Sequence, residues 1–192
     1  MLFCLFCCIL PAAASIIHMG IDMNIKTLYS ADQISEAVKK TAQEVESFFG
    51  SEEPVVALCL LNGAIWYAAD LLRCLPANFE LQTIRISSYD GTESTGKLKW
   101  HNALPDCKGK PVLVIDDVLD TGLTMKEVCN ALLENGATKV ASAVAINKRG
   151  RRNVAHEADF CSLHCDDFFL VGYGLDFNGK YRNLPFIGYI EA

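Results

Sequence analysis

The chain has 192 residues, of which 51% are hydrophobic and 21% charged, which fits one globular domain and excludes disordered, collagen-like and coiled-coil proteins. Seventeen basic residues stand against 23 acidic ones, so the formal net charge is -6, and no basic run of the kind that binds nucleic acid occurs. We therefore expect no nucleic-acid partner.

The first 22 residues form an extension whose apolar run is too short to span a membrane. The run ends at Pro11, well short of the roughly 20 residues that a spanning helix needs. A positive segment of the kind that opens a signal peptide is missing, and Met19 and Met23 offer later starts. We expect residues 1–22 to be a non-native or disordered extension, with a weak signal-like segment as the alternative. Residues 23–192 are expected to form one domain with no membrane partner.

Residues 30–50 are predicted to form an amphipathic helix. Its apolar positions recur at spacings of three and four and are Ile34, Ala37, Val38, Val45, Phe48 and Phe49. Ser30 and Gln33 make a capping box, and Gly50 supplies the stop.

Strands then alternate with helices along the chain. Short apolar runs predict strands at residues 55–61, 79–87, 111–115 and 140–146. Helices are predicted at residues 64–75 and 124–134, and a polar loop at residues 89–106. The alternation predicts an α/β fold in which a parallel sheet carries helices on both faces.

The cysteines indicate a reducing location. Nine is an odd number, and they are Cys4, Cys7, Cys8, Cys59, Cys74, Cys107, Cys129, Cys161 and Cys165. Most of the later ones fall within predicted helices and strands, which favours a cytoplasmic protein over a disulfide framework. Cys161, His164 and Cys165 lie close together in the sequence, but a structural zinc site needs four ligands and no second pair follows. We expect ordinary cysteines there.

The most informative segment is VLVIDDVLDTGLT at residues 112–124. Two adjacent carboxylates, Asp116 and Asp117, follow an apolar run where the strand should leave the sheet, and ligands of open α/β sheets bind at that edge. Residues 120–124 then open a helix, so backbone N–H groups and two hydroxyls converge on one point. The segment predicts an anion site suited to phosphate.

This segment resembles the 5-phosphoribosyl 1-pyrophosphate (PRPP) signature of the type I phosphoribosyltransferases. The resemblance implies their fold, a parallel sheet flanked by helices with a small hood built from the terminal segments. It implies that Asp116 and Asp117 contact the ribose hydroxyls and, through water, Mg²⁺. The residues implied to bind the 5-phosphate are Asp120, Thr121, Gly122, Leu123 and Thr124.

The neighbouring residues resemble the 6-oxopurine branch of that family. In this branch an aspartate at the position of Asp120 lies near purine N7 and acts as the catalytic general acid/base. The runs FLVGYGLD at residues 169–176 and KYRNLPFIG at residues 180–188 are similar to the hypoxanthine-guanine phosphoribosyltransferases. Two separate motifs therefore point to the same branch.

The resemblance also implies the groups that bind the purine and the leaving group. Phe169 is expected to stack on the purine, and backbone groups near Leu170 to read its edge. Asp176 is expected beside the purine, where it holds a second Mg²⁺, and Arg182 is expected to meet pyrophosphate. Lys148 resembles the lysine that donates to purine O6, which selects an oxo group over an amino group; an ordinary solvated lysine is the alternative.

Residues 61–64, LNGA, look like the family's pyrophosphate loop, in which a non-proline and often cis peptide exposes an N–H to the leaving group. Asn62 and Gly63 are the expected PRPP contacts. Asn62 stands where many relatives carry Lys, so Arg85 or Arg182 is expected to supply more of the compensating charge.

Ser88 and Tyr89 resemble the family's Ser-Tyr loop, which closes over the site and binds PRPP. Closure excludes water and so suppresses hydrolysis of PRPP. The run GTESTGK at residues 91–97 has Walker A spacing, but it is followed by Leu98 and lies in a polar loop instead of between a strand and a helix.

The sequence thus predicts a purine-salvage enzyme that joins hypoxanthine or guanine to the phosphoribosyl group of PRPP, with Mg²⁺ as cofactor. The alternatives are a xanthine-preferring enzyme, a pyrimidine-specific enzyme, and a PRPP-sensing regulator that binds nucleic acid on the same fold. The resemblance also implies a homodimer or homotetramer whose other partners are small-molecule substrates.

Overall fold

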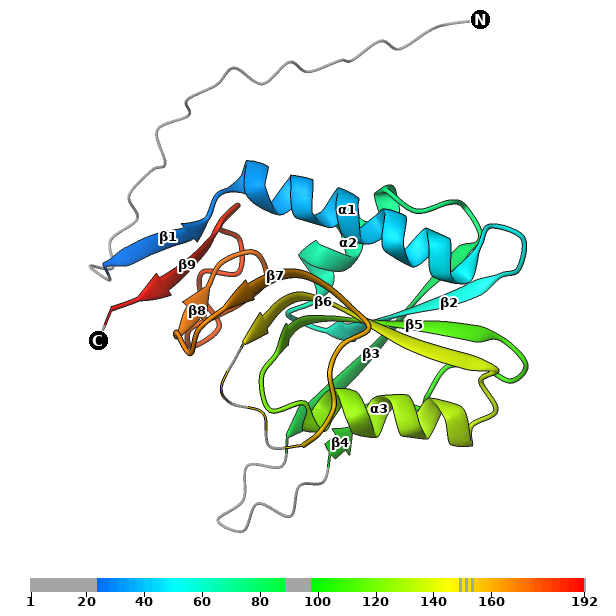
Figure 1. Ribbon diagram of the computed structural model, residues 1–192. Coiled ribbons are helices and arrows are strands. Elements are labelled where there is room, and N and C mark those ends of the chain that lie inside the picture. The colour runs from blue at the N-terminus through cyan, green and yellow to red at the C-terminus, as the bar shows by residue number, and fades with distance from the viewer. Residues whose placement is uncertain (1–23, 89–97, 149, 151, 153, 192) are drawn as a thin grey trace, which may run out of the picture.

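The computed structural model describes residues 24–88, 98–148, 150, 152 and 154–191 (Figure 1). The N-terminal extension, Tyr89, and the run with Walker A spacing lie outside these residues, as does the side chain of Ser88. In the described part of the chain, no helix has the length and apolar character needed to cross a membrane.

The described elements include the predicted helices and the predicted central strands. In chain order they are β1 (Ile25–Tyr29), α1 (Ala31–Phe49), β2 (Val55–Leu61), α2 (Ile65–Arg73), β3 (Phe79–Ser88), β4 (Leu98–Trp100), β5 (Pro111–Leu119), α3 (Leu123–Glu134), β6 (Lys139–Lys148), β7 (Phe160–Cys165), β8 (Leu170–Val171) and β9 (Ile187–Ile190).

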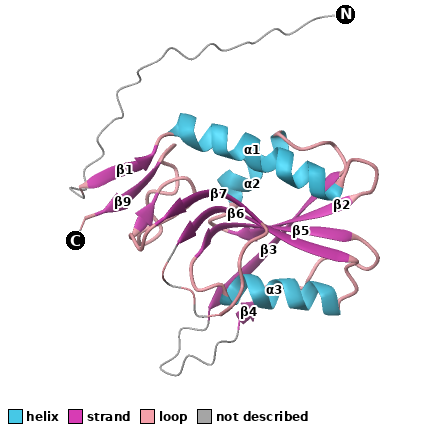
Figure 2. Cartoon of the chain, viewed as in Figure 1, coloured by secondary structure: helices cyan, strands magenta, loops and turns pink. Residues whose placement is uncertain are grey.

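The main sheet has the order β4-β3-β2-β5-β6-β7. All of its described neighbours pair in parallel except β4, which runs antiparallel to β3 at the edge. Helices α1 and α2 cover one face and α3 covers the other (Figure 2). This confirms the predicted α/β architecture, because a parallel sheet needs both faces covered.

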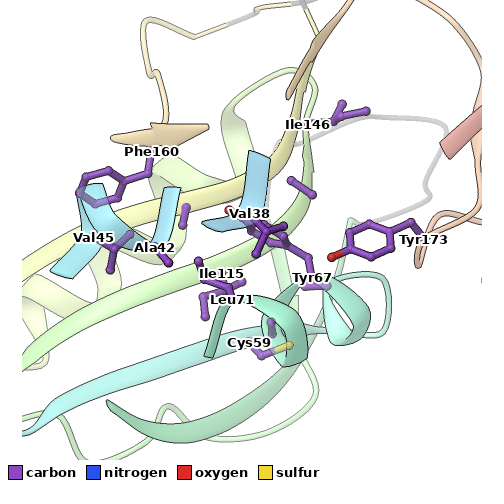
Figure 3. Packing of buried hydrophobic residues seen from close by; sticks show 14 of the residues in the cluster. Val38, Ala42, Val45, Cys59, Tyr67, Leu71, Ile115, Ile146, Phe160 and Tyr173 are labelled. Carbon is purple, nitrogen blue, oxygen red and sulfur yellow. The ribbon is translucent and has the colours of Figure 1, made fainter. Parts of the chain in front are cut away.

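The sheet separates two apolar clusters. Helix α1 begins with the predicted Ser30–Gln33 capping box and turns Val38 and Val45 into the first cluster, which also contains Tyr67 of α2 (Figure 3). The second cluster lies beneath α3 and includes Met125 and Leu132. Burial on both sides holds the strand ends, and the residues that follow them, in fixed positions.

Three strands of the main sheet differ most from the prediction, and β1, β8 and β9 of the second sheet were not predicted individually. Strand β5 continues to Leu119, so Asp116 and Asp117 lie inside the strand instead of after its end. The reason is pairing: Asp116 lies opposite Val144 of β6, and Val118 opposite Ile146. Strand β4 lies within the predicted polar loop, and β7 was not predicted. Both lie at edges of the sheet, where neighbours on one side only leave a weaker sequence pattern.

A second, antiparallel sheet is formed by β1, β9 and β8 in that order. Ile25 lies opposite Ile190, and Leu170 opposite Tyr189. This small sheet stands beside the ends of β6 and β7 (Figure 1). It is the hood that the resemblance implied, and it brings the C-terminal motif to the edge where ligands of open α/β sheets bind.

Candidate active site

The acidic pair, Asp116 and Asp117, lies near the end of β5. The backbone N–H of Asp117 donates to Asp116 Oδ1 at 2.9 Å, and the N–H of Val118 donates to Asp117 Oδ1 at 2.9 Å. Burial raises the pKa of Asp116 well above its usual value, and the adjacent carboxylate adds to the rise. Burial also raises the pKa of Asp117, opposed by hydrogen bonds and by the Arg182 charge. The pair is therefore short of compensating positive charge.

The end of β5 and the residues that follow it form an open pocket of about 320 Å³, lined by residues 116–122 with Thr124 and Met125. The chain turns at Gly122, whose φ of 84° lies in the left-handed region, and α3 begins at the next residue. The N–H of Leu123 donates to Thr121 Oγ1 at 3.4 Å. A turn that opens a helix and carries hydroxyls is suited to an anion. We call residues 120–124 the anion loop.

Lys148 and Asp120 face each other across adjacent strand ends. Lys148 Nζ lies 4.0 Å from Asp120 Oδ2, and the lysine side chain is only 11% exposed. A cation and a carboxylate thus stand together beside the pocket. This contact places Lys148 beside the anion loop, and its role as the donor to purine O6 stays a prediction.

Arg152 supports the anion loop from behind, and the sequence analysis did not single it out. Its NH1 donates to the backbone oxygen of Asp120 at 2.6 Å. Its other nitrogens bind the side chains of Asn147 and Glu157. A signal was present in the basic cluster after Lys148, but nothing in sequence spacing tells which arginine of that cluster folds back.

The loop at residues 61–64 approaches the acidic pair very closely. The Leu61–Asn62 peptide is cis, as the resemblance implied. A Cβ on Gly63 would lie 1.7 Å from Asp117 Oδ2, and a Cβ on Gly174 would lie 2.0 Å from the backbone oxygen of Gly63. Glycine is therefore required at both places by close approach. Asn62 itself is exposed.

Arg182 and Asp176 complete this side of the site. Arg182 NH2 lies 2.6 Å from Asp176 Oδ1, and NH1 donates to the backbone oxygen of Gly174. Asp176 Oδ2 also accepts from the N–H of Gly179 at 2.7 Å. We call Asn62, Gly63, Gly174, Asp176 and Arg182 the Gly63 corner. Arg85 is exposed on β3, opposite Leu61 in the strand register.

The hood contributes an exposed aromatic ring. Phe169 is 52% exposed, which is unusual for its size, and its ring makes an edge contact with Phe177 at 5.5 Å. Leu170 is buried and pairs with Tyr189 through the hood sheet. The ring of Phe169 is therefore available for stacking while the residue after it is held rigidly.

The candidate site offers carboxylates that suit one metal ion better than another. Among the described residues, no group of three or more His, Cys, Asp or Glu side chains is placed to hold a metal ion. Mg²⁺ has different needs, because it keeps several waters and is held by one or two carboxylates together with substrate phosphates. The undercompensated acidic pair beside the pocket fits that ion.

Comparison with known proteins gives a consistent result. The family model "Phosphoribosyl transferase domain" matches residues 24–178. The chain is 41% identical over 169 residues to the hypoxanthine-guanine phosphoribosyltransferase of Aquifex aeolicus, a match that covers 87% of this chain and 95% of the relative. It is 35% identical to the hypoxanthine-guanine-xanthine phosphoribosyltransferase of Tritrichomonas foetus, covering 86% of this chain and 91% of the relative.

Solved structures agree with the sequence relatives. A hypoxanthine phosphoribosyltransferase from Staphylococcus aureus superposes with a TM-score of 0.83 at 30% identity, covering 88% of this chain and 92% of that one. A hypoxanthine-guanine phosphoribosyltransferase from Bacillus anthracis gives 0.81 at 34% identity, covering 86% and 98%. The similarity thus extends over most of the described fold.

Proposed function

The chain belongs to the phosphoribosyltransferase family, and we propose that it transfers the 5-phosphoribosyl group of PRPP to N9 of hypoxanthine or guanine. The products are IMP or GMP and pyrophosphate, so the protein is a transferase of purine salvage. The observation that carries this proposal is the placement of Asp120 and Lys148, 4.0 Å apart, beside the anion loop. A proton-transferring carboxylate and an O6 donor are what a 6-oxopurine requires.

The anion loop binds the 5-phosphate in this proposal. The backbone N–H groups and hydroxyls of Thr121, Gly122, Leu123 and Thr124 surround it, and the N-terminus of α3 favours its negative charge. Asp116 and Asp117 receive the ribose hydroxyls. These contacts fix C1 of the ribose next to the purine, and such positioning supplies much of the rate in reactions of this kind.

The Gly63 corner receives the leaving group. Backbone N–H groups at Asn62 and Gly63 and the guanidinium of Arg182 face the pyrophosphate, and Ser88 and Tyr89 close over it. Asp116, Asp117 and Asp176 would hold Mg²⁺, which supplies charge neutralisation to the pyrophosphate when bound. The Arg182–Asp176 ion pair would then separate, so that Arg182 contacts the pyrophosphate and Asp176 contacts the metal ion.

The purine lies against Phe169, with its edge at the backbone of Leu170 and beside Asp176. Lys148 donates to O6. Because the bond to pyrophosphate breaks before much bonding to N9 develops, the transition state has oxocarbenium character, as at other glycosidic carbons. Asp120 takes the N7 proton as N9 bonds to the ribose, and the acidic pair stabilises the positive sugar.

A xanthine preference is the second candidate, because one relative carries xanthine in its name. The regulator alternative is disfavoured by the net charge of -6 and by the relatives, which are named as transferases. A cytoplasmic location and a homodimer or homotetramer complete the proposal. Among the described residues, Cys59, Cys74, Cys107, Cys129 and Cys165 form no disulfide, which supports a reducing location. Light scattering tests the assembly, and a monomer would contradict it.

The test is nucleotide formation from PRPP and Mg²⁺ with hypoxanthine, guanine, xanthine, adenine or uracil. We expect turnover of hypoxanthine and guanine only. Asp120→Ala should lower kcat by about 100-fold, as loss of a general acid/base does, whereas Asp32→Ala, in the exposed first turn of α1, should change nothing. PRPP binding without turnover of any base would instead support the regulator.

A further inference from the structure

Arg152 contacts the anion loop and is not among the residues that line the pocket. Its NH1 donates to the backbone oxygen of Asp120 at 2.6 Å, a short hydrogen bond from a charged donor. Its side chain is only 18% exposed, so this contact is partly shielded from water. The carbonyl that it binds belongs to the peptide group between Asp120 and Thr121.

The guanidinium is held in place by two further side chains. Its Nε donates to Glu157 Oε1 and its NH2 to Glu157 Oε2, both at 3.1 Å. NH2 also donates to Asn147 Oδ1, and Asn147 Nδ2 donates to Glu157 Oε2 at 3.2 Å. The hydrogen bond from Arg152 lowers the pKa of Glu157, which keeps this carboxylate charged. The guanidinium plane therefore has a defined direction.

The backbone around Arg152 also packs against the loop. The N–H of Val154 donates to the backbone oxygen of Thr121 at 3.4 Å. A Cβ on Gly122 would lie 3.1 Å from Arg152 Cδ and 3.1 Å from the backbone oxygen of His156. The loop is thus bound at two successive carbonyls, from Asp120 and Thr121, while its other side lines the pocket.

We propose that Arg152 is a positioning residue: it makes the anion loop a stronger hydrogen-bond donor to the phosphate, without contacting the phosphate itself. A cationic donor on a peptide oxygen draws electron density from the N–H of the same peptide, so that N–H becomes a stronger donor. Here that N–H is the one of Thr121. The inference rests on the proposed function, because it assigns the 5-phosphate to the anion loop.

Arginine is required by this arrangement. Lysine supplies a charge but has no planar fork, so it cannot bind the Asp120 oxygen while also holding Glu157 through two nitrogens. We therefore expect Arg152→Lys to behave more like Arg152→Gln than like the native chain. Glu157→Gln keeps the shape of the side chain but weakens its hold on the Arg152 guanidinium. Its effect on phosphate affinity should therefore be smaller than that of Arg152→Gln.

The experiment compares ligands with and without the 5-phosphate. Titration calorimetry with ribose 5-phosphate, IMP and inosine is performed on the native chain, Arg152→Gln, Arg152→Lys and Arg152→Ala. Binding of the two phosphorylated ligands should weaken about tenfold, which corresponds to ~1.4 kcal/mol, while inosine binding changes less than about twofold. Arg73→Gln removes an exposed arginine, paired with Asp70 on α2, and serves as the matched control with no change.

Two further readouts separate this role from a general structural one. The amide resonance of Thr121 should move in Arg152→Gln by more than that of Thr138, which lies on the surface away from the loop. Guanidinium ion added to Arg152→Ala should restore part of the affinity for ribose 5-phosphate and none for inosine. Equal weakening for inosine and IMP, or a native-like Arg152→Gln with unchanged phosphate affinity, would overturn the inference.

Failure of the proposed function gives a different pattern. If no base is converted but ribose 5-phosphate binds and its affinity falls in Arg152→Gln, the transferase proposal fails and the role of Arg152 stands. If the native chain converts hypoxanthine and Arg152→Gln binds ribose 5-phosphate normally, the role of Arg152 fails alone. A native chain that binds no 5-phosphate ligand overturns both.

Discussion

The anion loop and the Gly63 corner lie on either side of the acidic pair and are built in opposite ways. The anion loop is one continuous stretch, residues 120–124, whose shape follows from a strand end, a turn at Gly122 and the start of α3. The Gly63 corner joins segments more than a hundred residues apart by backbone contact between Gly63 and Gly174. A site built from one continuous stretch tolerates small changes in packing, whereas a site assembled from distant segments is sensitive to them.

The largest expected effect comes from breaking the assembled corner. Gly174→Ala places a Cβ 2.0 Å from a backbone oxygen, at a φ of 100° that alanine disfavours, so backbone must move. We expect kcat/KM to fall by more than about 100-fold, since misplacement of about 1 Å already has effects of that size. Steady-state kinetics and thermal unfolding measure the change.

The matched control is Gly50→Ala, at a φ of 77° with no atom within 4 Å of the added Cβ. It isolates the cost of left-handed backbone, about 1–2 kcal/mol, and should leave kcat/KM intact. Native-like turnover by Gly174→Ala would show that the corner tolerates displacement after all.

A smaller effect is expected in the anion loop. Thr124→Ala removes one hydroxyl from the pocket wall and leaves the turn unchanged. A hydrogen bond to a charged group contributes about 1.5–3 kcal/mol, so PRPP affinity should fall at least tenfold with little change in Tm. Thr138→Ala, at an exposed position, is the control. A drop in Tm as large as that of Gly174→Ala would erase the contrast between the two regions.

The acidic pair should show a conflict between activity and stability. Because burial raises the pKa of Asp116, the folded chain binds its proton more tightly than the unfolded chain does. The free energy of unfolding therefore falls as the pH rises above 3.8, the usual pKa of an aspartate carboxyl. Asp116→Asn should raise Tm by about 2–4 °C for each kcal/mol of relief at pH 7, while it lowers turnover.

Asp106→Asn, at an exposed site, should leave both quantities unchanged. The stability gain of Asp116→Asn should shrink at acidic pH, where the native carboxyl is protonated. A lower Tm for Asp116→Asn than for the native chain at pH 7 would mean that positive charge or hydrogen bonds within the fold stabilise the Asp116 carboxylate.

The smallest effect concerns two buried thiols, one behind each region. Burial raises the pKa of Cys59, on β2 near the acidic pair, and of Cys129, in α3 behind the anion loop, each to about 12. At pH 8 both remain protonated, so iodoacetamide should label exposed Cys74 and leave these two until the chain unfolds. Peptide mapping after timed labelling checks this. Faster labelling of Cys59 than of Cys129 would indicate local opening of the corner.

Sequence reasoning predicted the local parts of the molecule well. The apolar runs located the central strands because burial on both faces leaves a continuous pattern. The motif at residues 112–124 located the acidic pair and the anion loop together, because they are contiguous. The end of β5 was placed too early because pairing with β6 continued through two carboxylates. The edge strands β4 and β7 were missed.

The assembled parts needed the fold. Gly174 appears in the sequence as one glycine of a motif, and its contact with Gly63 depends on how the hood meets the main sheet. Arg152 belongs to the basic cluster after Lys148, and its hydrogen bond to Asp120 depends on the path of the chain after β6. Neither distance is encoded by spacing along the chain.

The hood sheet joins strands from the two ends of the described chain. Ile25 pairs with Ile190, and Lys26 binds Glu191, 165 residues further on. Of the described strands, β1 leaves the ribosome before the main sheet and β9 after it, so the hood forms only once the main sheet has been synthesised. The same adjacency makes the molecule a candidate for circular permutation, in which a short linker joins β9 to β1 and new ends open elsewhere.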